Sequence, residues 1–118
     1  MFNLKNETSD NPSLERKTME IVGTKNDSKL IVALSGRLDA NTSPELESYL
    51  RDNFNNIADL TLDLSDVQYV SSAGLRVFLY AYKELAKTGG QMVLAHPNVY
   101  ISDVLDATGF TELMKIED

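Results

Sequence analysis

The sequence predicts a single α/β domain built on a mixed, mostly parallel sheet of four to five strands with helices packed on it. Two observations predict this class. Apolar stretches with strand character alternate along the chain with amphipathic helical stretches, which is typical of parallel strands joined by helical crossovers. The chain also opens with two strand-like stretches around a turn, which adds an antiparallel pair and makes the sheet mixed.

Five strands are expected, and each is bounded by turn residues. In chain order they cover 18–24, 29–35, 59–64, 91–95 and 112–117. The second is strongly apolar and rich in branched side chains, so we expect it to be buried. Gly36 breaks that pattern, the third strand alternates between apolar and polar residues, and Pro97 follows the fourth. Residues 65–71 form either a loop or a short extension of the third strand.

Three helices are expected between these strands, over 44–55, 72–88 and 99–107. Ser43 is a candidate cap for the first, with Pro44 at the first helical position. A capping box from Thr42 to Glu45 offers a competing start. Asn98 is the candidate cap of the third helix. The expected core residues are Ile31, Ala33, Leu62, Leu64, Leu75, Leu79, Val93 and Val104.

Composition excludes several classes of function. Of the 118 residues, 11 are Lys or Arg and 18 are Asp or Glu, which gives a net charge of −7. Nucleic acid and anionic membranes would repel such a chain, so we expect neither as a partner. There is no cysteine, and His96 is the single histidine, which argues against a disulfide framework and a metal site. No cofactor is expected.

The termini and hydropathy indicate a cytoplasmic protein with one domain. No apolar run approaches the ~20 residues of a membrane span, and no signal peptide opens the chain. Residues 1–17 are polar and lack sustained periodicity, so we expect a flexible N-terminal arm. The domain then covers 18–118 and carries the whole net charge, because the charges of the arm cancel.

The stretch with the most chemistry is a strand-to-helix junction that ends in a pair of serines, Ser71 and Ser72. Ligands of α/β folds collect at the carboxyl ends of strands, and the first turn of a helix favours an anion. A serine here is therefore a candidate phosphate acceptor, although ordinary helix capping explains most such serines. A phosphate would repel nearby carboxylates and reshape the surface. Three carboxylates are expected nearby: Asp39, Asp63 and Asp66.

The run DLSDVQYVSSAGLRVFL resembles the signature of the anti-sigma-factor antagonists, the STAS-domain family. The upstream GRLDANTSPEL and the final VLDATGFTELMKI are similar to other family segments, in matching order over about 18–117. The resemblance implies a STAS-type single domain in which Ser72, two residues before Gly74, is phosphorylated. Ser71 is the second choice. This chain departs from the well-known switch members in having Ser71 for Asp and Ala73 for Ser or Thr.

The resemblance also implies a function without catalysis by the chain itself. The unphosphorylated protein would bind an anti-sigma factor with serine kinase activity, an ATPase of histidine-kinase-like type, and thereby free a sigma factor. Phosphorylation would end the complex, and a serine phosphatase would reset it; the free protein is expected to be a monomer. Apart from the resemblance, Arg76 is expected to face solvent, and its i, i+4 spacing from Ser72 would also allow it to contact a partner or to help neutralise a phosphate. The expected partner-binding residues are Asp39, Asp63, Asp66, Ser71, Ser72, Gly74 and Arg76.

Three alternatives stay open. The domain could be a non-phosphorylated docking subunit of a transport, lipid-trafficking or stress-signalling complex. A phospho-acceptor receiver using Asp63 is disfavoured, because no acidic pair follows the first strand to hold Mg²⁺. An enzyme with Ser72 as nucleophile and His96 as base is disfavoured as well, because the Gly-x-Ser-x-Gly elbow is absent.

Overall fold

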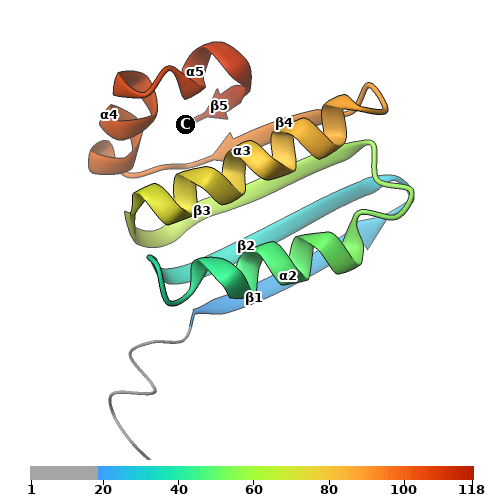
Figure 1. The fold of residues 1–118 in the computed structure, drawn as a ribbon, viewed down its shortest axis with the longest axis horizontal. Helices are drawn as coiled ribbons and strands as arrows, with labels where there is room; N and C mark the ends of the chain where they lie inside the picture. The colour runs from blue at the N-terminus through green and yellow to red at the C-terminus, as the bar shows by residue number, and fades with distance from the viewer. Residues whose placement is uncertain (1–18) are drawn as a thin grey trace, which may run out of the picture.

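A five-stranded sheet forms the centre of the structure, and its strand order follows the chain (Figure 1). The computed structural model describes residues 19–118, so the expected arm over 1–17 lies outside the described residues. Strand β1 (Glu20–Asn26) pairs antiparallel with β2 (Lys29–Leu38). Strands β3 (Asp59–Val70), β4 (Gln91–Ala95) and β5 (Lys115–Glu117) follow in parallel. The predicted mixed, mostly parallel sheet is confirmed.

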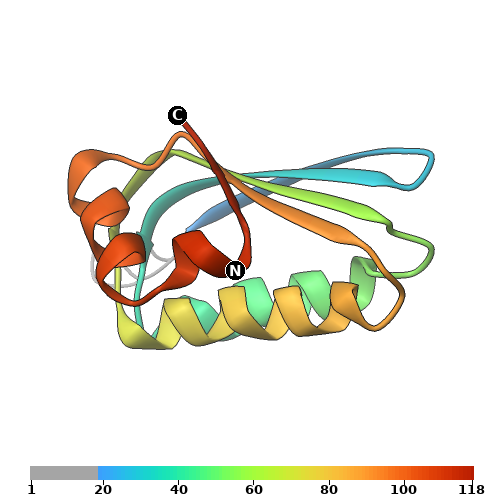
Figure 2. The same ribbon diagram turned by 90° about the horizontal axis from the view of Figure 1, so that it is seen from above.

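The helices cover one face of this sheet. Helices α2 (Ser43–Asn53) and α3 (Ser72–Ala86) run side by side beneath it (Figure 2). Helix α4 (Val99–Ala107) and the short α5 (Phe110–Leu113) lie at one end, near the carboxyl end of β4 (Figure 1). Within residues 19–118, no helix covers the opposite face. None of the helices in this part of the chain is long and apolar enough to span a membrane.

One-sided coverage decides which strand residues form the core. Leu30, Val32 and Leu34 of β2 are buried, whereas Ile31 is 42% exposed and Ala33 is exposed too. The prediction of a buried Ile31 and Ala33 is therefore wrong, because alternate side chains of a strand point to opposite faces and only one face has a cover. Further core predictions are confirmed for Leu62 and Leu64, while four others are half-buried: Leu75, Leu79, Val93 and Val104.

Strand β2 runs further than predicted, and the segment after residue 64 adopts the strand extension that was one of its two expected conformations. Strand β3 ends at Val70 rather than at residue 64, and β2 passes through Gly36, where φ is 111°. The register shifts twice along the pair, then continues with Arg37 opposite Tyr69. Backbone pairing continues through stretches in which polar residues are interspersed with the buried Leu38, Val67 and Val70. This extension brings the ends of β2 and β3 to the start of α3.

The predicted cap of α4 is confirmed, whereas the predicted caps of α2 are wrong. Asn98 Oδ1 accepts a hydrogen bond from Ile101 N at 2.8 Å, as expected. Helix α2 has Thr42 at its N-cap position without a side-chain cap, so neither the Ser43 cap nor the capping box forms. Thr42 instead donates from Oγ1 to the carbonyl of Arg37 at 2.7 Å, which fixes the preceding loop. Helix α5 was not expected and shortens the last predicted strand.

Candidate functional site

The two serines at the start of α3 have different roles. Ser71 is the N-cap, with extended backbone, and its Oγ accepts a hydrogen bond from Gly74 N at 3.4 Å. Ser72 is the first residue of the helix, and its side chain is exposed. Ser71 is only half-exposed. The geometry therefore favours Ser72 as the hydroxyl that an external enzyme can reach.

The loop that carries Asp39 adjoins these serines. The backbone N–H of Ser71 donates to the carbonyl of Leu38 at 2.8 Å, which joins the end of β2 to the start of α3. The carboxylate of Asp39 accepts from the N–H of Asn41 at 2.9 Å and from that of Thr42 at 3.1 Å. These bonds hold the loop in one conformation. The structure thus brings together two of the expected site elements, Asp39 and the serine pair.

Gly74 allows the close packing that holds the serines in place. A Cβ at this position would lie 2.8 Å from both Cγ and Cδ2 of Leu38 and 3.1 Å from Cγ1 of Val70. Real Cβ atoms do not approach neighbours as closely as 2.8 Å. Gly74 itself is buried. Gly74 therefore lets α3 start directly against the ends of β2 and β3, and its role in partner binding stays a prediction.

The structure does not bring Asp63 and Asp66 to the serines. Asp63 lies opposite Ala33 of β2 and Ala95 of β4, in the middle of β3 rather than at its end. Asp66 pairs with Ser35, three residues before Leu38, so at about 3.3 Å per residue it lies about 10 Å back from the end of β3, and Asp63 lies further back. Both carboxylates therefore lie within the paired part of β3 rather than in a loop that leads to the serines. Their role in partner binding stays a prediction.

Arg76 lies at a shallow hollow between the first turns of α2 and α3. The hollow has a volume of about 250 Å³ and also contains Ala73 and Glu47 on its lining. Arg76 is exposed and follows Ser72 by one helical turn, as the sequence predicts. Ser43 contributes a buried Oγ without a hydrogen-bond partner. The hollow therefore combines one cation, one anion and small side chains beside the serines.

The sequence did not predict a stack of three side chains that forms where β2 and β3 end and α4 begins. The guanidinium of Arg37 lies 4.3 Å from the centre of the Tyr69 ring. The ring of Tyr100, on α4, stacks with that of Tyr69. The two ring centroids are 6.0 Å apart and the interplanar angle is 14°. The stack depends on the register of β2 against β3 and on where α4 starts, neither of which the local sequence pattern reveals.

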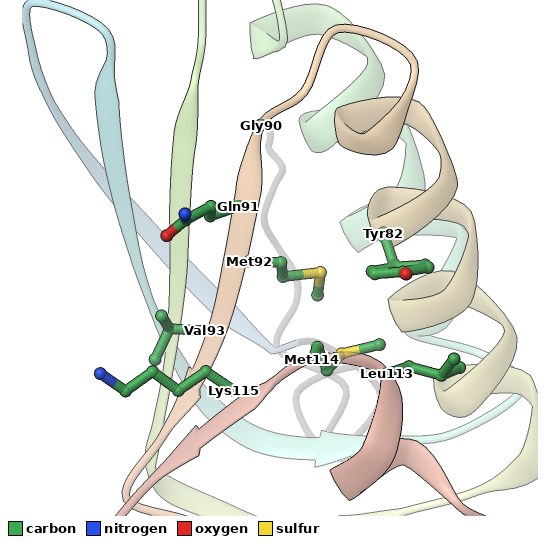
Figure 3. A pocket seen from close by; sticks show the side chains of 8 residues that line it. All are labelled: Tyr82, Gly90, Gln91, Met92, Val93, Leu113, Met114 and Lys115. Atoms are coloured by element: carbon green, nitrogen blue, oxygen red, sulfur yellow. The ribbon is translucent and has the colours of Figure 1, made fainter.

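A second hollow of about 300 Å³ lies far along α3 from the serines, between α3, β4 and α5 (Figure 3). Tyr82, Met92, Leu113 and Met114 point into it, whereas Gln91, Val93 and Lys115 point to the other side of the sheet. Its inner side chains are mostly apolar, without a converging pair of charges. Within residues 19–118, no three His, Cys, Asp or Glu residues cluster to hold a metal ion.

Comparison with known proteins identifies the family. A model of the STAS domain matches residues 18–118. The chain belongs to the STAS domain family. It is 33% identical over 91 residues to an anti-sigma F factor antagonist of Paenibacillus polymyxa, covering 75% of this chain and 78% of that protein. It is 31% identical over 91 residues to an anti-sigma-B factor antagonist of Bacillus subtilis, covering 77% and 84%.

The fold of this STAS domain is similar to that of the anti-sigma factor antagonist SpoIIAA. The unphosphorylated form of SpoIIAA aligns with a TM-score of 0.69 at 15% identity, covering 85% of this chain and 87% of SpoIIAA. Its phosphorylated form, described as a Bacillus cell fate determinant, aligns with a TM-score of 0.68 at 15% identity, covering 82% and 90%. The family and fold expected from the serine motif are confirmed.

Proposed function

We propose that this STAS domain is an anti-sigma factor antagonist that phosphorylation of Ser72 switches off. The unphosphorylated domain binds an anti-sigma factor with serine kinase activity and so frees a sigma factor. The kinase transfers the γ-phosphoryl group of ATP to Ser72 Oγ, the serine proton is released, and ADP leaves. A serine phosphatase hydrolyses the phosphate ester and restores the binding form. The chain is a substrate and binding protein in this scheme, rather than an enzyme.

The observation that carries the proposal is the exposed Ser72 at the first position of a 15-residue helix, beside the Asp39 loop. The relatives named as antagonists and the phosphorylated form of SpoIIAA support it. The cap role of Ser71 supports Ser72 over Ser71 as acceptor, because phosphorylation of Ser71 would displace its hydrogen bond to the helix.

The physical effect of the phosphate is local. A phosphate of charge about −1.5 to −2 at the first turn is compatible with the positive end of the α3 dipole, so the helix persists. Within an interface, the same charge must find a cation or suffer desolvation. A loss of ~3 kcal/mol already weakens binding more than a hundredfold. The switch therefore requires no refolding of the domain.

Two variants test the proposal, with a matched control for added charge. Ser72→Ala and Ser72→Asp are used as baits in lysate of the source organism, and bound proteins are identified by mass spectrometry. We expect Ser72→Ala to capture a histidine-kinase-like anti-sigma factor and Ser72→Asp to lose it. Ser28→Asp, in the exposed β1–β2 turn, adds the same charge at the opposite end of β2 and should keep the partner.

The purified partner then allows phosphorylation by ATP to be mapped. Phosphate on Ser72 agrees with the proposal, and phosphate on Ser71 alone contradicts the assigned acceptor. If both Ser72 baits hold the same partners, Ser72 is not a switch. The domain would then be a constitutive docking subunit.

A further inference from the structure

A strip of three exposed side chains and one half-buried ring lies near the serines, at the carboxyl ends of β2 and β3 and the first turn of α4. It consists of Arg37, Tyr69, Val99 and Tyr100, and we call it the aromatic strip. Val99 is 79% exposed and Tyr100 is 48% exposed, although both are large apolar or aromatic side chains. They are sequence neighbours in the first turn of α4. Together they form a small exposed apolar surface at the first turn of α4.

The aromatic strip is held in place by bonds to the strand ends. Asn98, which caps α4, donates from Nδ2 to the carbonyl of Val67 at 3.3 Å and to that of Gln68 at 3.4 Å. This anchors the first turn of α4 to β3, so that Tyr100 reaches Tyr69. The guanidinium of Arg37 lies over the ring of Tyr69, the member of this aromatic pair on β3. Stacking fixes the plane of the guanidinium before any partner arrives, which lowers the entropy cost of using it.

The strip and Ser72 lie close enough to share one partner. Arg37 pairs with Tyr69 in the register of β2 and β3, and the next pair, Leu38 with Val70, leads directly to Ser71. A standard interface buries about 800 Å² on each protein, which corresponds to a patch with a radius of about 16 Å. A protein whose active site reaches Ser72 therefore also covers adjoining surface, and the strip contains two of the five large apolar or aromatic side chains that are exposed within residues 19–118.

The composition of the strip fits a protein partner of definite chemistry. Tyrosine and arginine are enriched among the residues that dominate binding energy at interfaces. The chain has a net charge of −7, but Arg37 is a cation. A basic group of the partner would repel Arg37, whereas a carboxylate of the partner facing Arg37 would attract it. Val99 and Tyr100 favour an apolar hollow beside that carboxylate. A partner that has both features would bind more tightly than other kinases that could phosphorylate Ser72.

We propose that the aromatic strip is a second docking surface for the anti-sigma factor kinase that reads Ser72, and that it sets which kinase binds. The inference rests on the proposed function and names the partner surface of that same site. The partner carries an apolar hollow flanked by a carboxylate, next to its nucleotide site. The strip supplies affinity and selectivity in both phosphorylation states, whereas Ser72 supplies the switch.

Binding and phosphorylation of strip variants test this inference. The probe is the purified kinase captured by Ser72→Ala. The first variant combines Val99→Ser with Tyr100→Ser, and the second is Arg37→Glu. Leu113→Ser is the matched control, because Leu113 is 46% exposed but lies on α5 beside the other hollow. Unchanged thermal midpoints establish that each variant is folded. Arg37→Glu is a single exposed change and serves if the double variant unfolds.

We expect both strip variants to raise the Kd for the kinase at least tenfold, with Leu113→Ser unchanged. The rate of Ser72 phosphorylation at saturating kinase should stay within twofold of wild type, because the strip does not touch the transferred phosphate. A Kd within twofold of wild type for both strip variants overturns the inference. Loss of binding by Ser72→Asp in the same experiment keeps the proposed function standing. Equal binding by Ser72→Ala and Ser72→Asp would instead overturn the proposed function, whatever the strip variants do.

Discussion

Replacing Gly74 with alanine tests the packing that positions the serines. The new methyl group would lie 2.8 Å from Leu38 Cγ and Cδ2, and Leu38 is fully buried. Overpacking of this kind costs about 1–3 kcal/mol. Alanine regains up to about 1 kcal/mol because it is a better helix former than glycine. We therefore expect Gly74→Ala to lower the free energy of unfolding by about 1–2 kcal/mol.

Urea denaturation followed by circular dichroism measures this change, and the m value should stay constant because the exposed area of unfolding does not change. For a chain of this length, the midpoint temperature should fall by about 4–8 °C. Leu38→Ala alone should cost about 2–5 kcal/mol through the cavity it leaves. In the double variant the new methyl group occupies part of that cavity. The combined loss should then be smaller than the sum by at least about 1 kcal/mol.

Two results would refute the reasoning. One is a Gly74→Ala variant that is as stable as wild type or more stable. The higher helix propensity of alanine would then not be offset by a clash with Leu38. The other is additivity within about 0.5 kcal/mol in the double variant, since the two side chains would then not compete for the same space. Either would show that the start of α3 tolerates a side chain at this contact.

Three further changes probe other parts of the domain. Asn98→Ala removes the cap of α4 and its bonds to β3, so the free energy of unfolding in urea should fall by about 1–2 kcal/mol; an unchanged value would contradict the anchoring role. Leu62→Ala should cost about 2–5 kcal/mol and Ile31→Ala less than about 1 kcal/mol; equal costs would argue for a second covered face. The hydrogen bond and charge of Glu84 raise the pKa of Lys87, so Glu84→Gln should lower that pKa towards its ordinary value in an NMR titration.

The local sequence predicted the cap of α4 correctly, although it failed at the start of α2, where Thr42 Oγ1 bonds to the carbonyl of Arg37 instead. Asn98 caps α4 because an asparagine side chain reaches its own helix's free N–H groups, and this requires no information from the rest of the chain. The serine motif identified the family for a similar reason, since its residues are contiguous. The strand-helix alternation likewise predicted the parallel sheet, as helical crossovers leave a periodic signature.

What depends on contacts between distant segments was not predictable. Both faces of the strand KLIVALS carry apolar side chains, so the local sequence does not indicate whether Leu30 or Ile31 is buried. Leu30 is buried because the helices cover only the face on which it lies. The tail of β3 mixes polar residues with the buried Val67 and Val70, and it pairs with β2. The stack of Arg37 on Tyr69 follows from that same pairing, which joins residues about 30 positions apart.

The consecutive order of the strands has a consequence for how the domain is made. Every strand pairs with the strand that precedes it in the sequence, so the sheet can grow at one edge in the direction of synthesis. A chain leaving the ribosome can form the β1–β2 hairpin first and add β3, β4 and β5 as each is released, without displacing a strand already paired. Ser72 follows β3 directly, so its surroundings are complete only after β2 and β3 have joined. We expect a nascent chain to become a kinase substrate only after α3 has docked.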